Sequence, residues 1–345
     1  MGRTTHAPAP PRRCRRTVGS MAFQYWTETA GHGAWREVPE PHADVSAGQL
    51  RVRTTATAVS RGTETLVHTG KVPAAVGTLM KAPHQLGEFT FPVSYGYLGV
   101  GEVDEGPQEW LGARVFGLLP HHCHHIVSAQ DIQRIPDDVP HHRALLAGAA
   151  ETGLNILWQE PPRLADRVAI IGAGMIGTAT ALLASGMGLD RLEVLETNED
   201  RRELMAGLGL TAVHPEQAAG DCDIVIHTSG SEPGLARALE IAGDDGTVVE
   251  ASWFGSQAPR VPLGADFHAR RLKIVASQVG QVAEGRRARR TRAERLQTAL
   301  RLLRDERFEA LLTGQSPREE LPAVMDQITS DTELARTTLC HVLTY

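Results

Sequence analysis

Six consecutive residues in the middle of the chain have the types and spacing that hold a phosphate group. They are Gly172-Ala173-Gly174-Met175-Ile176-Gly177, between an apolar run and a run rich in alanine and leucine. Glycines in this spacing allow a tight turn, a close approach of a ligand to the backbone and close packing of a helix on a strand. Because N–H groups at a helix start attract negative charge, we expect the turn to bind the pyrophosphate of a dinucleotide. A glycine-rich turn that binds no ligand is the alternative.

An acidic residue follows the turn at the distance where a coenzyme ribose would lie. Glu196 ends the next apolar run, about 20 residues after Gly177. A carboxylate there accepts hydrogen bonds from the ribose hydroxyls of adenosine and repels a 2′-phosphate. The pattern predicts NAD rather than NADP, whereas the positive charges of Arg201 and Arg202 favour NADP.

The elements that position these residues belong to an α/β protein. Residues 21–140 show short alternating runs separated by glycine and proline, which is typical of β-strands. Residues 166–278 alternate apolar strands with helices, which is typical of a doubly wound parallel sheet. We expect five strands in that sheet, at 168–172, 191–196, 223–227, 247–251 and 273–276. A helix that carries Leu296, Leu300 and Leu303 on one face and a final strand at 337–345 should return to the β-rich part.

The composition favours a small-molecule partner. With 345 residues, 41% hydrophobic, and a net charge of -6, the chain can bury a core and has no general attraction to nucleic acid or to an anionic membrane. Its four cysteines, Cys14, Cys123, Cys222 and Cys340, are too far apart for a cysteine zinc site and fit a reducing cytoplasm. We expect a soluble cytoplasmic protein with a disordered tail at residues 1–20, and Met21 is an alternative start.

Two further segments resemble the metal-binding segments of the medium-chain dehydrogenase/reductase superfamily, which includes the zinc alcohol dehydrogenases. Ser60-Arg61-Gly62-Thr63-Glu64 is similar to its Cys-Gly-Thr-Asp segment, and residues 96–103 (GYLGVGEV) are similar to its Gly-His-Glu segment. The resemblance implies a GroES-like β-rich catalytic domain at 21–157 and 281–345 and a Rossmann NAD-binding domain at 158–280. It also implies a homodimer joined through the strand near 273–276.

Several short segments resemble the subgroup that includes bacteriochlorophyllide a dehydrogenase. They are residues 60–64, Pro120-His121, Glu151-Thr152, 229–232 (SGSE), 252–255 (SWFG), Phe267-His268 and 277–280 (SQVG). This resemblance implies NAD-dependent interconversion of a secondary alcohol and a ketone on a side chain of a ring-containing metabolite. It also places Ser229 and Asn155 beside the coenzyme.

The residues at the three zinc-ligand positions depart from the family pattern. Arg61 and Tyr97 stand at the first and second positions, and Glu151 stands at the third. Catalytic zinc needs three protein ligands, so one carboxylate does not hold it, and we predict no zinc. Glu151 and Asn155 lie four residues apart on an expected helix, and we predict that both face the cleft between the domains.

Without a metal, side chains must stabilise the oxyanion and move the proton. We predict that Thr63 and Tyr97 transfer the proton, that Arg61 supplies a fixed positive charge, and that Glu64 belongs to the same catalytic group. The alternatives are structural: Arg61 pairs with Glu64, and the Tyr97 ring serves packing.

Two clusters leave other interpretations open. In His121-His122-Cys123-His124-His125, the first, third and fifth side chains would share one side of a strand and could bind a metal; otherwise the segment is a histidine-rich turn. An arginine run would be a solvated face or a receptor for an anionic substrate. Its members are Arg286, Arg287, Arg289, Arg290, Arg292 and Arg295.

The sequence therefore favours an NAD(H)-dependent alcohol dehydrogenase or ketone reductase that works without zinc. A zinc-free quinone or enoyl reductase that uses NADPH is one alternative. A dinucleotide-binding protein without catalytic activity is another, because a retired enzyme would also lose its metal ligands.

Overall fold

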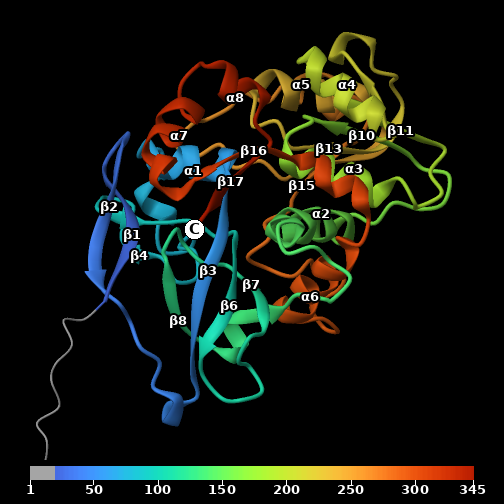
Figure 1. Cartoon of the computed structure of the whole chain (residues 1–345). Coiled ribbons are helices and arrows are strands. Elements are labelled where there is room, and N and C mark those ends of the chain that lie inside the picture. Colours follow the sequence, from blue (N-terminus) through green and yellow to red (C-terminus); the bar gives the residue numbers. More distant parts are fainter. Residues whose placement is uncertain (1–19) are drawn as a thin grey trace, which may run out of the picture.

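The computed structural model describes residues 20–345, so the tail predicted for residues 1–20 lies outside the described residues apart from Ser20. In this part the strands form three sheets of four, seven and six strands. Figure 1 shows the strands of the N-terminal part on one side and the parallel sheet with its helices on the other. No helix within residues 20–345 has the length and apolar character needed to cross a bilayer.

The first two sheets contain the first and the last strands of the chain. Their orders are β2-β1-β5-β4 and β16-β17-β3-β6-β7-β9, with β8 paired to β3. The strands are β1 (Met21–Thr29), β2 (His32–Pro39), β3 (Gln49–Ser60), β4 (Leu86–Gly87), β5 (Val93–Ser94), β6 (Gly99–Glu105), β7 (Arg114–Gly117), β8 (His124–Ser128), β9 (Ile132–Arg134), β16 (Leu312–Pro317) and β17 (Cys340–Thr344). Since β17 pairs with β3, the predicted return of the C-terminal part to the β-rich part is confirmed.

The third sheet is entirely parallel and has the order β12-β11-β10-β13-β14-β15. Its strands are β10 (Arg167–Ile171), β11 (Arg191–Leu195), β12 (Thr211–Val213), β13 (Cys222–His227), β14 (Ala242–Glu250) and β15 (Lys273–Ala276). This is the order of dinucleotide-binding folds, in which the ligand site lies where the order reverses, here between β10 and β13. The five predicted strands are confirmed. The sequence pattern missed β12 because this strand has three residues and none is buried.

One long helix links the parallel sheet to the β-rich part. The helices are α1 (Arg61–His68), α2 (Ala147–Gln159), α3 (Met175–Ala184), α4 (Glu199–Gly207), α5 (Glu232–Ile241), α6 (Arg292–Leu302), α7 (Leu321–Ile328) and α8 (Glu333–Thr337). Helix α2 packs on α3, with Gly153 so close to Thr180 that a Cβ would lie 3.0 Å from its Oγ1. Helix α6 packs on α2 with the predicted face of Leu296, Leu300 and Leu303 buried.

The final strand is shorter than predicted. Residues 333–337 form α8, since the Thr332 side chain accepts the N–H of Ala335 and caps the helix, and β17 begins only at Cys340. All strands of the parallel sheet lie between residues 167 and 276, and all strands of the other sheets lie outside this range. The parallel sheet and the other two sheets are thus built from separate stretches of the chain.

Candidate functional site

The glycine-rich turn connects β10 to α3 at the reversal of strand order. Gly172 has a positive φ of 103°, and Gly174 is the N-cap of α3. A Cβ on Gly177 would lie 1.8 Å from the Gly172 carbonyl oxygen, whereas a Cβ on Gly174 would meet no atom within 4 Å. Gly177 is thus required by packing, while the space at Gly174 is open for a ligand next to the first N–H groups of α3.

Glu196 follows β11 and lies against this turn. Its Oε2 accepts the N–H of Ala173 at 2.8 Å, and its Oε1 accepts the N–H of Asn198 at 2.9 Å. The residue is buried, and the nearest guanidinium nitrogen of Arg201 is 4.0 Å from Oε2. A carboxylate offers about four lone-pair sites, so Glu196 keeps acceptor capacity for ribose hydroxyls.

Arg61 is the first residue of α1 and is partly buried. Burial lowers the pKa of Arg61, the nearby charge of Arg201 lowers it further, and Glu196 opposes both effects. The alternative in which Arg61 pairs with Glu64 is wrong, because Glu64 has other partners. The charges that affect Arg61 most are thus those of Arg201 and Glu196.

Glu64 connects the start of α1 to the segment that contains His121 through hydrogen bonds. Its Oε1 accepts the N–H of Ser60 at 2.8 Å, and its Oε2 lies 2.9 Å from Nε2 of His121. The other ring nitrogen of His121 lies 2.7 Å from Oγ1 of Thr57. With Glu64 and His121 both buried, this chain of contacts holds the segment that carries Thr63.

Tyr97 and Thr63 form a hydroxyl group cluster with Ser60. The Tyr97 hydroxyl donates to Oγ of Ser60. Burial raises the pKa of Tyr97 to about 12, against opposing effects of its hydrogen bonds with Ser60 and Thr63. At neutral pH the phenol is therefore protonated, with the hydroxyl of Ser60 bonded to it and that of Thr63 nearby.

Glu151 and Asn155 do not face an open cleft as predicted, because their side chains are buried and bonded to Arg295. Arg295 Nε lies 3.0 Å from Oε1 of Glu151, and its Nη1 donates to Oδ1 of Asn155 at 2.5 Å. The same guanidinium donates to the carbonyl oxygens of Gln281, at 2.9 Å, and Val279. Burial raises the pKa of Glu151, and the charge of Arg295 only partly opposes this.

Arg295 therefore differs from the rest of the arginine run. The other five arginines are exposed, and Arg295 is 1% exposed. The interpretation of the run as one solvated or substrate-binding face is thus wrong for this member. It ties α6 and α2 to the segment that follows β15.

The histidine segment does not assemble as predicted for a metal site. Residues 121–123 are not in a strand, so the alternation of sides begins only with β8 at His124. His121 contacts Glu64, while the rings of His122 and His125 stack with centroids 5.1 Å apart. In the described part of the chain, no group of three or more His, Cys, Asp or Glu side chains could hold a metal ion.

A second polar group lies at the ends of β13 and β14, and the sequence analysis named its Ser229 but missed His227 and Glu250. His227 pairs in register with Glu250, and Nδ1 of His227 lies 2.7 Å from Oε2 of Glu250. On its other side, Nε2 lies 2.7 Å from Oγ of Ser229. Ionisable residues at the last positions of two successive strands were the available signal.

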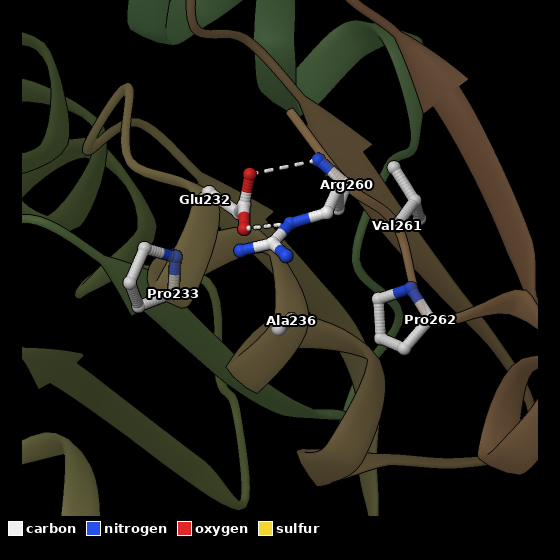
Figure 2. A pocket seen from close by; sticks show the side chains of 6 residues that line it. All are labelled: Glu232, Pro233, Ala236, Arg260, Val261 and Pro262. Carbon is white, nitrogen blue, oxygen red and sulfur yellow. Dashed lines mark hydrogen bonds and ion pairs between the residues drawn. The ribbon is translucent and has the colours of Figure 1, made fainter. Parts of the chain in front are cut away.

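A shallow hollow of about 290 Å³ lies at the start of α5. Figure 2 shows Glu232 and Arg260 facing each other across it, with Nε of Arg260 2.9 Å from Oε1 of Glu232. The remaining lining residues are Pro233, Ala236, Val261 and Pro262. Because its only charged groups are paired with each other, this hollow is not the candidate active site.

No family model matches the chain. A curated protein assigned as a D-xylulose reductase of Rhizobium meliloti (strain 1021) is 26% identical over 164 residues, which are 44% of this chain and 47% of that protein. The match thus spans about half the length of the curated relative.

Solved structures match nearly the whole chain. An alcohol dehydrogenase of Escherichia coli CFT073 in complex with NADH is 16% identical, with a TM-score of 0.75, over 95% of this chain and 100% of that chain. A protein described as a zinc-binding dehydrogenase of Sinorhizobium meliloti 1021, bound to NADP, is 18% identical, with a TM-score of 0.75, over 94% and 100%. This chain has the fold of the medium-chain, zinc-type alcohol dehydrogenases. The fold expected from the sequence is confirmed.

Within the medium-chain fold, the residues present fit a dinucleotide and do not fit a catalytic zinc ion. The open space at Gly174 and the carboxylate of Glu196 suit a pyrophosphate and a ribose. At the ligand positions, Arg61 is a cation, Tyr97 carries its proton, and Glu151 is already paired with Arg295. Zinc needs three deprotonated or neutral ligands around one point, and this arrangement does not offer them.

Proposed function

We propose that the protein is an NAD(H)-dependent oxidoreductase that interconverts a secondary alcohol and a ketone without catalytic zinc. The observation that carries the proposal is the hydrogen bond between the Glu196 carboxylate and the N–H of Ala173 inside the glycine-rich turn. It puts an acceptor for ribose hydroxyls beside the donors for a pyrophosphate, as NAD requires. Met175 and Ile176, at the start of α3, complete the expected coenzyme contact.

The chain's own residues account for the proton and the charge. NAD(H), when bound, takes up or delivers the hydride. In the direction of ketone reduction, the Tyr97 hydroxyl, which donates to Ser60 in the free protein, turns its proton to the carbonyl oxygen. A proton from solvent, passed on through the neighbouring hydroxyls of Ser60 and Thr63, restores the phenol. The fixed charges of Arg61 and Arg201 lie at the coenzyme end, where they balance the negative charge of a pyrophosphate. We therefore assign Arg61 to the coenzyme rather than to the substrate oxygen.

Glu151 and Asn155 act indirectly in this proposal. They fix Arg295, which holds the backbone after β15, at the carboxyl end of the parallel sheet where the coenzyme of such folds lies. Each is thus a positioning residue, and Glu151 does not touch the reacting atoms.

The finer parts of the proposal concern the substrate and the assembly. The resemblance to the subgroup that acts on a macrocycle favours a ketone or alcohol on a side chain of a ring-containing metabolite. Strand β15 forms the edge of the parallel sheet, and its Ile274 is 38% exposed, which supports a homodimer built across this edge. We also propose that the protein is located in the cytoplasm.

One observation favours a second candidate, an NADPH-dependent quinone or enoyl reductase. Arg201 approaches Glu196 only to 4.0 Å, and within residues 20–345 its Nε has no hydrogen-bond partner. A guanidinium in this position could bind a 2′-phosphate.

Titration of NADH and NADPH into the wild type, Glu196→Ala and Arg201→Ala decides between the two candidates. The proposal predicts that the wild type binds NADH more tightly than NADPH. In Glu196→Ala, NADH binding should weaken about tenfold, and the difference between the affinities for NADH and NADPH should become smaller. Glu199→Ala, a change at an exposed residue three positions later, should have no effect. Preference for NADPH that is lost in Arg201→Ala would establish the second candidate instead.

A further inference from the structure

The polar group at the ends of β13 and β14 is a continuous series of four hydrogen-bonded side chains. Glu250 lies 2.7 Å from His227, and His227 lies 2.7 Å from Ser229. Oγ of Ser229 lies 2.8 Å from Oγ of Ser231. These contacts join side chains and are not part of the backbone hydrogen bonds that pair β13 with β14.

The carboxylate at one end fixes the direction of every hydrogen bond. Glu250 accepts the N–H of Ser252 at 2.7 Å through Oε1, and its Oε2 faces the imidazole. Since a carboxylate can only accept, the imidazole proton lies on Nδ1, and Nε2 accepts the proton of the Ser229 hydroxyl. The Ser231 hydroxyl then donates to Ser229. Ser229 therefore has only lone pairs left for a ligand, and the aligned bonds strengthen one another.

Ser229 is the exposed member of this group, and Ser231 is half-buried. His227 is fully buried and the Glu250 side chain is 17% exposed, whereas Ser229 is exposed. Ser229 lies against the glycine-rich turn, because a Cβ on Gly172 would be 3.0 Å from the Ser229 Cα. One lone pair of Ser229 accepts from Ser231 Oγ, and the other meets only the long 3.3 Å contact of the Ser231 N–H.

The position of Ser229 indicates which ligand group it accepts. Glu196 follows β11 and Ser229 follows β13, and these strands flank β10 on opposite sides. A dinucleotide that crosses the reversal of strand order puts one nucleotide on each side, so the adenosine ribose beside Glu196 leaves the second ribose for Ser229. The N–H donors of α3 between them serve the phosphates.

The geometry points to Ser229 as the hydrogen-bond acceptor for a hydroxyl of the nicotinamide ribose, with His227 and Glu250 as positioning residues that fix its polarity. This inference rests on the coenzyme proposal above. It adds a specificity element to the site: a buried histidine and a partly buried glutamate that make a serine select a hydroxyl group rather than a phosphate oxygen.

The test compares NADH with an NADH analogue whose nicotinamide ribose lacks both hydroxyls, by titration of the full chain. The wild type should bind NADH about tenfold more tightly than the analogue, as one hydrogen bond of ordinary strength provides. In Ser229→Ala the ratio should fall to about one. In Glu250→Gln, an isosteric change, the amide can donate to Nδ1, the imidazole proton moves to Nε2, and the ratio should fall to roughly threefold.

The binding ratio separates this role from a structural one, because a loss of folding weakens the binding of both compounds equally. Ser256→Ala, at an exposed serine of a neighbouring loop, is the matched control and should keep the wild-type ratio. A ratio that stays within twofold of the wild type in both Ser229→Ala and Glu250→Gln, or a wild-type ratio near one, overturns this inference and leaves the coenzyme proposal intact. Failure of the wild type to bind NADH at all overturns both.

Discussion

The coenzyme end of the protein and the end that corresponds to the metal site are built in different ways. Around Gly174 and Glu196, backbone N–H groups and one carboxylate are arranged by a strand, a turn and a helix that follow one another in the chain. Around Tyr97 and Glu151, the side chains are half-buried or buried and are bonded to partners from distant segments. The first end has open space for a ligand at Gly174, whereas Tyr97 and Glu151 at the second end each have a side-chain partner.

This difference indicates that a site made of backbone N–H groups can be retained while a site made of side chains loses its ligands. A dinucleotide turn depends on glycine spacing and on a helix start, so it persists while the surrounding side chains vary. A metal site depends on the chemical type of three side chains. Here Glu151, at the third ligand position, forms an ion pair with the guanidinium of Arg295. The comparison predicts that changes at one end affect stability, and changes at the other affect binding.

The largest expected effect is on stability at the ion-paired end. Arg295→Met leaves Glu151 buried without a partner, which should lower the free energy of unfolding by about 3–5 kcal/mol. The double variant Glu151→Leu with Arg295→Met removes both charges and should recover most of the loss. Urea denaturation measures both. Arg292→Met, an exposed position on the same helix, is the control and should shift stability by less than about 0.5 kcal/mol.

An equal loss in the single and double variants would show that the contacts of Arg295 with the backbone of Gln281 and Val279, rather than its charge, stabilise the protein.

At the coenzyme end, a substitution of Gly174 should affect NADH binding and leave stability unchanged. Gly174→Asp places a good N-cap residue where a Cβ meets no atom, so stability should not fall. Its carboxylate takes the N–H groups of α3 and repels a pyrophosphate, so NADH affinity should fall roughly 100-fold. Gly177→Ala should instead destabilise the protein, since its Cβ would lie 1.8 Å from the Gly172 carbonyl oxygen. Calorimetric titration and thermal unfolding separate the two results; unchanged NADH affinity in Gly174→Asp would contradict the assignment of the turn.

The β-rich part should be sensitive to acid. Burial lowers the pKa of His122 to about 3 and lowers that of His125 well below its ordinary value. The unfolded chain binds these protons first, so stability is lost as the pH falls from about 6.5 towards 3, by about 1.4 kcal/mol per pH unit for each histidine. His125→Phe should reduce this slope by one proton, and His32→Gln, at an exposed residue, should not. Urea denaturation at pH 5, 6 and 7 measures the slopes; identical slopes in all three proteins would refute the account.

The smallest expected effect is on turnover. Tyr97→Phe and Thr63→Val remove members of the hydroxyl cluster, so each should lower kcat at least tenfold with NADH and acetophenone as the probe ketone. NADH affinity should stay within twofold, because neither residue belongs to the coenzyme end. A lower affinity with unchanged kcat would place the cluster at the coenzyme instead.

The sequence predicted the coenzyme end because its signal is local. The glycine spacing and the acidic residue at the end of the next strand lie within 25 residues of one another, and strand, turn and helix form where expected. The partners at the other end could not be predicted, since Arg295 is 144 residues from Glu151 and His121 is 57 residues from Glu64. Arg295 stood in a run of exposed arginines, and only the packing of α6 on α2 brings it inside.

The central claim is that this protein binds NADH with no zinc in its active site. The most direct test is a titration of NADH into tag-free protein treated with a chelator, with zinc counted in the same sample. We predict NADH binding with the same affinity before and after treatment and far less than one zinc ion per chain. Stoichiometric zinc that the chelator removes together with NADH binding would contradict the account.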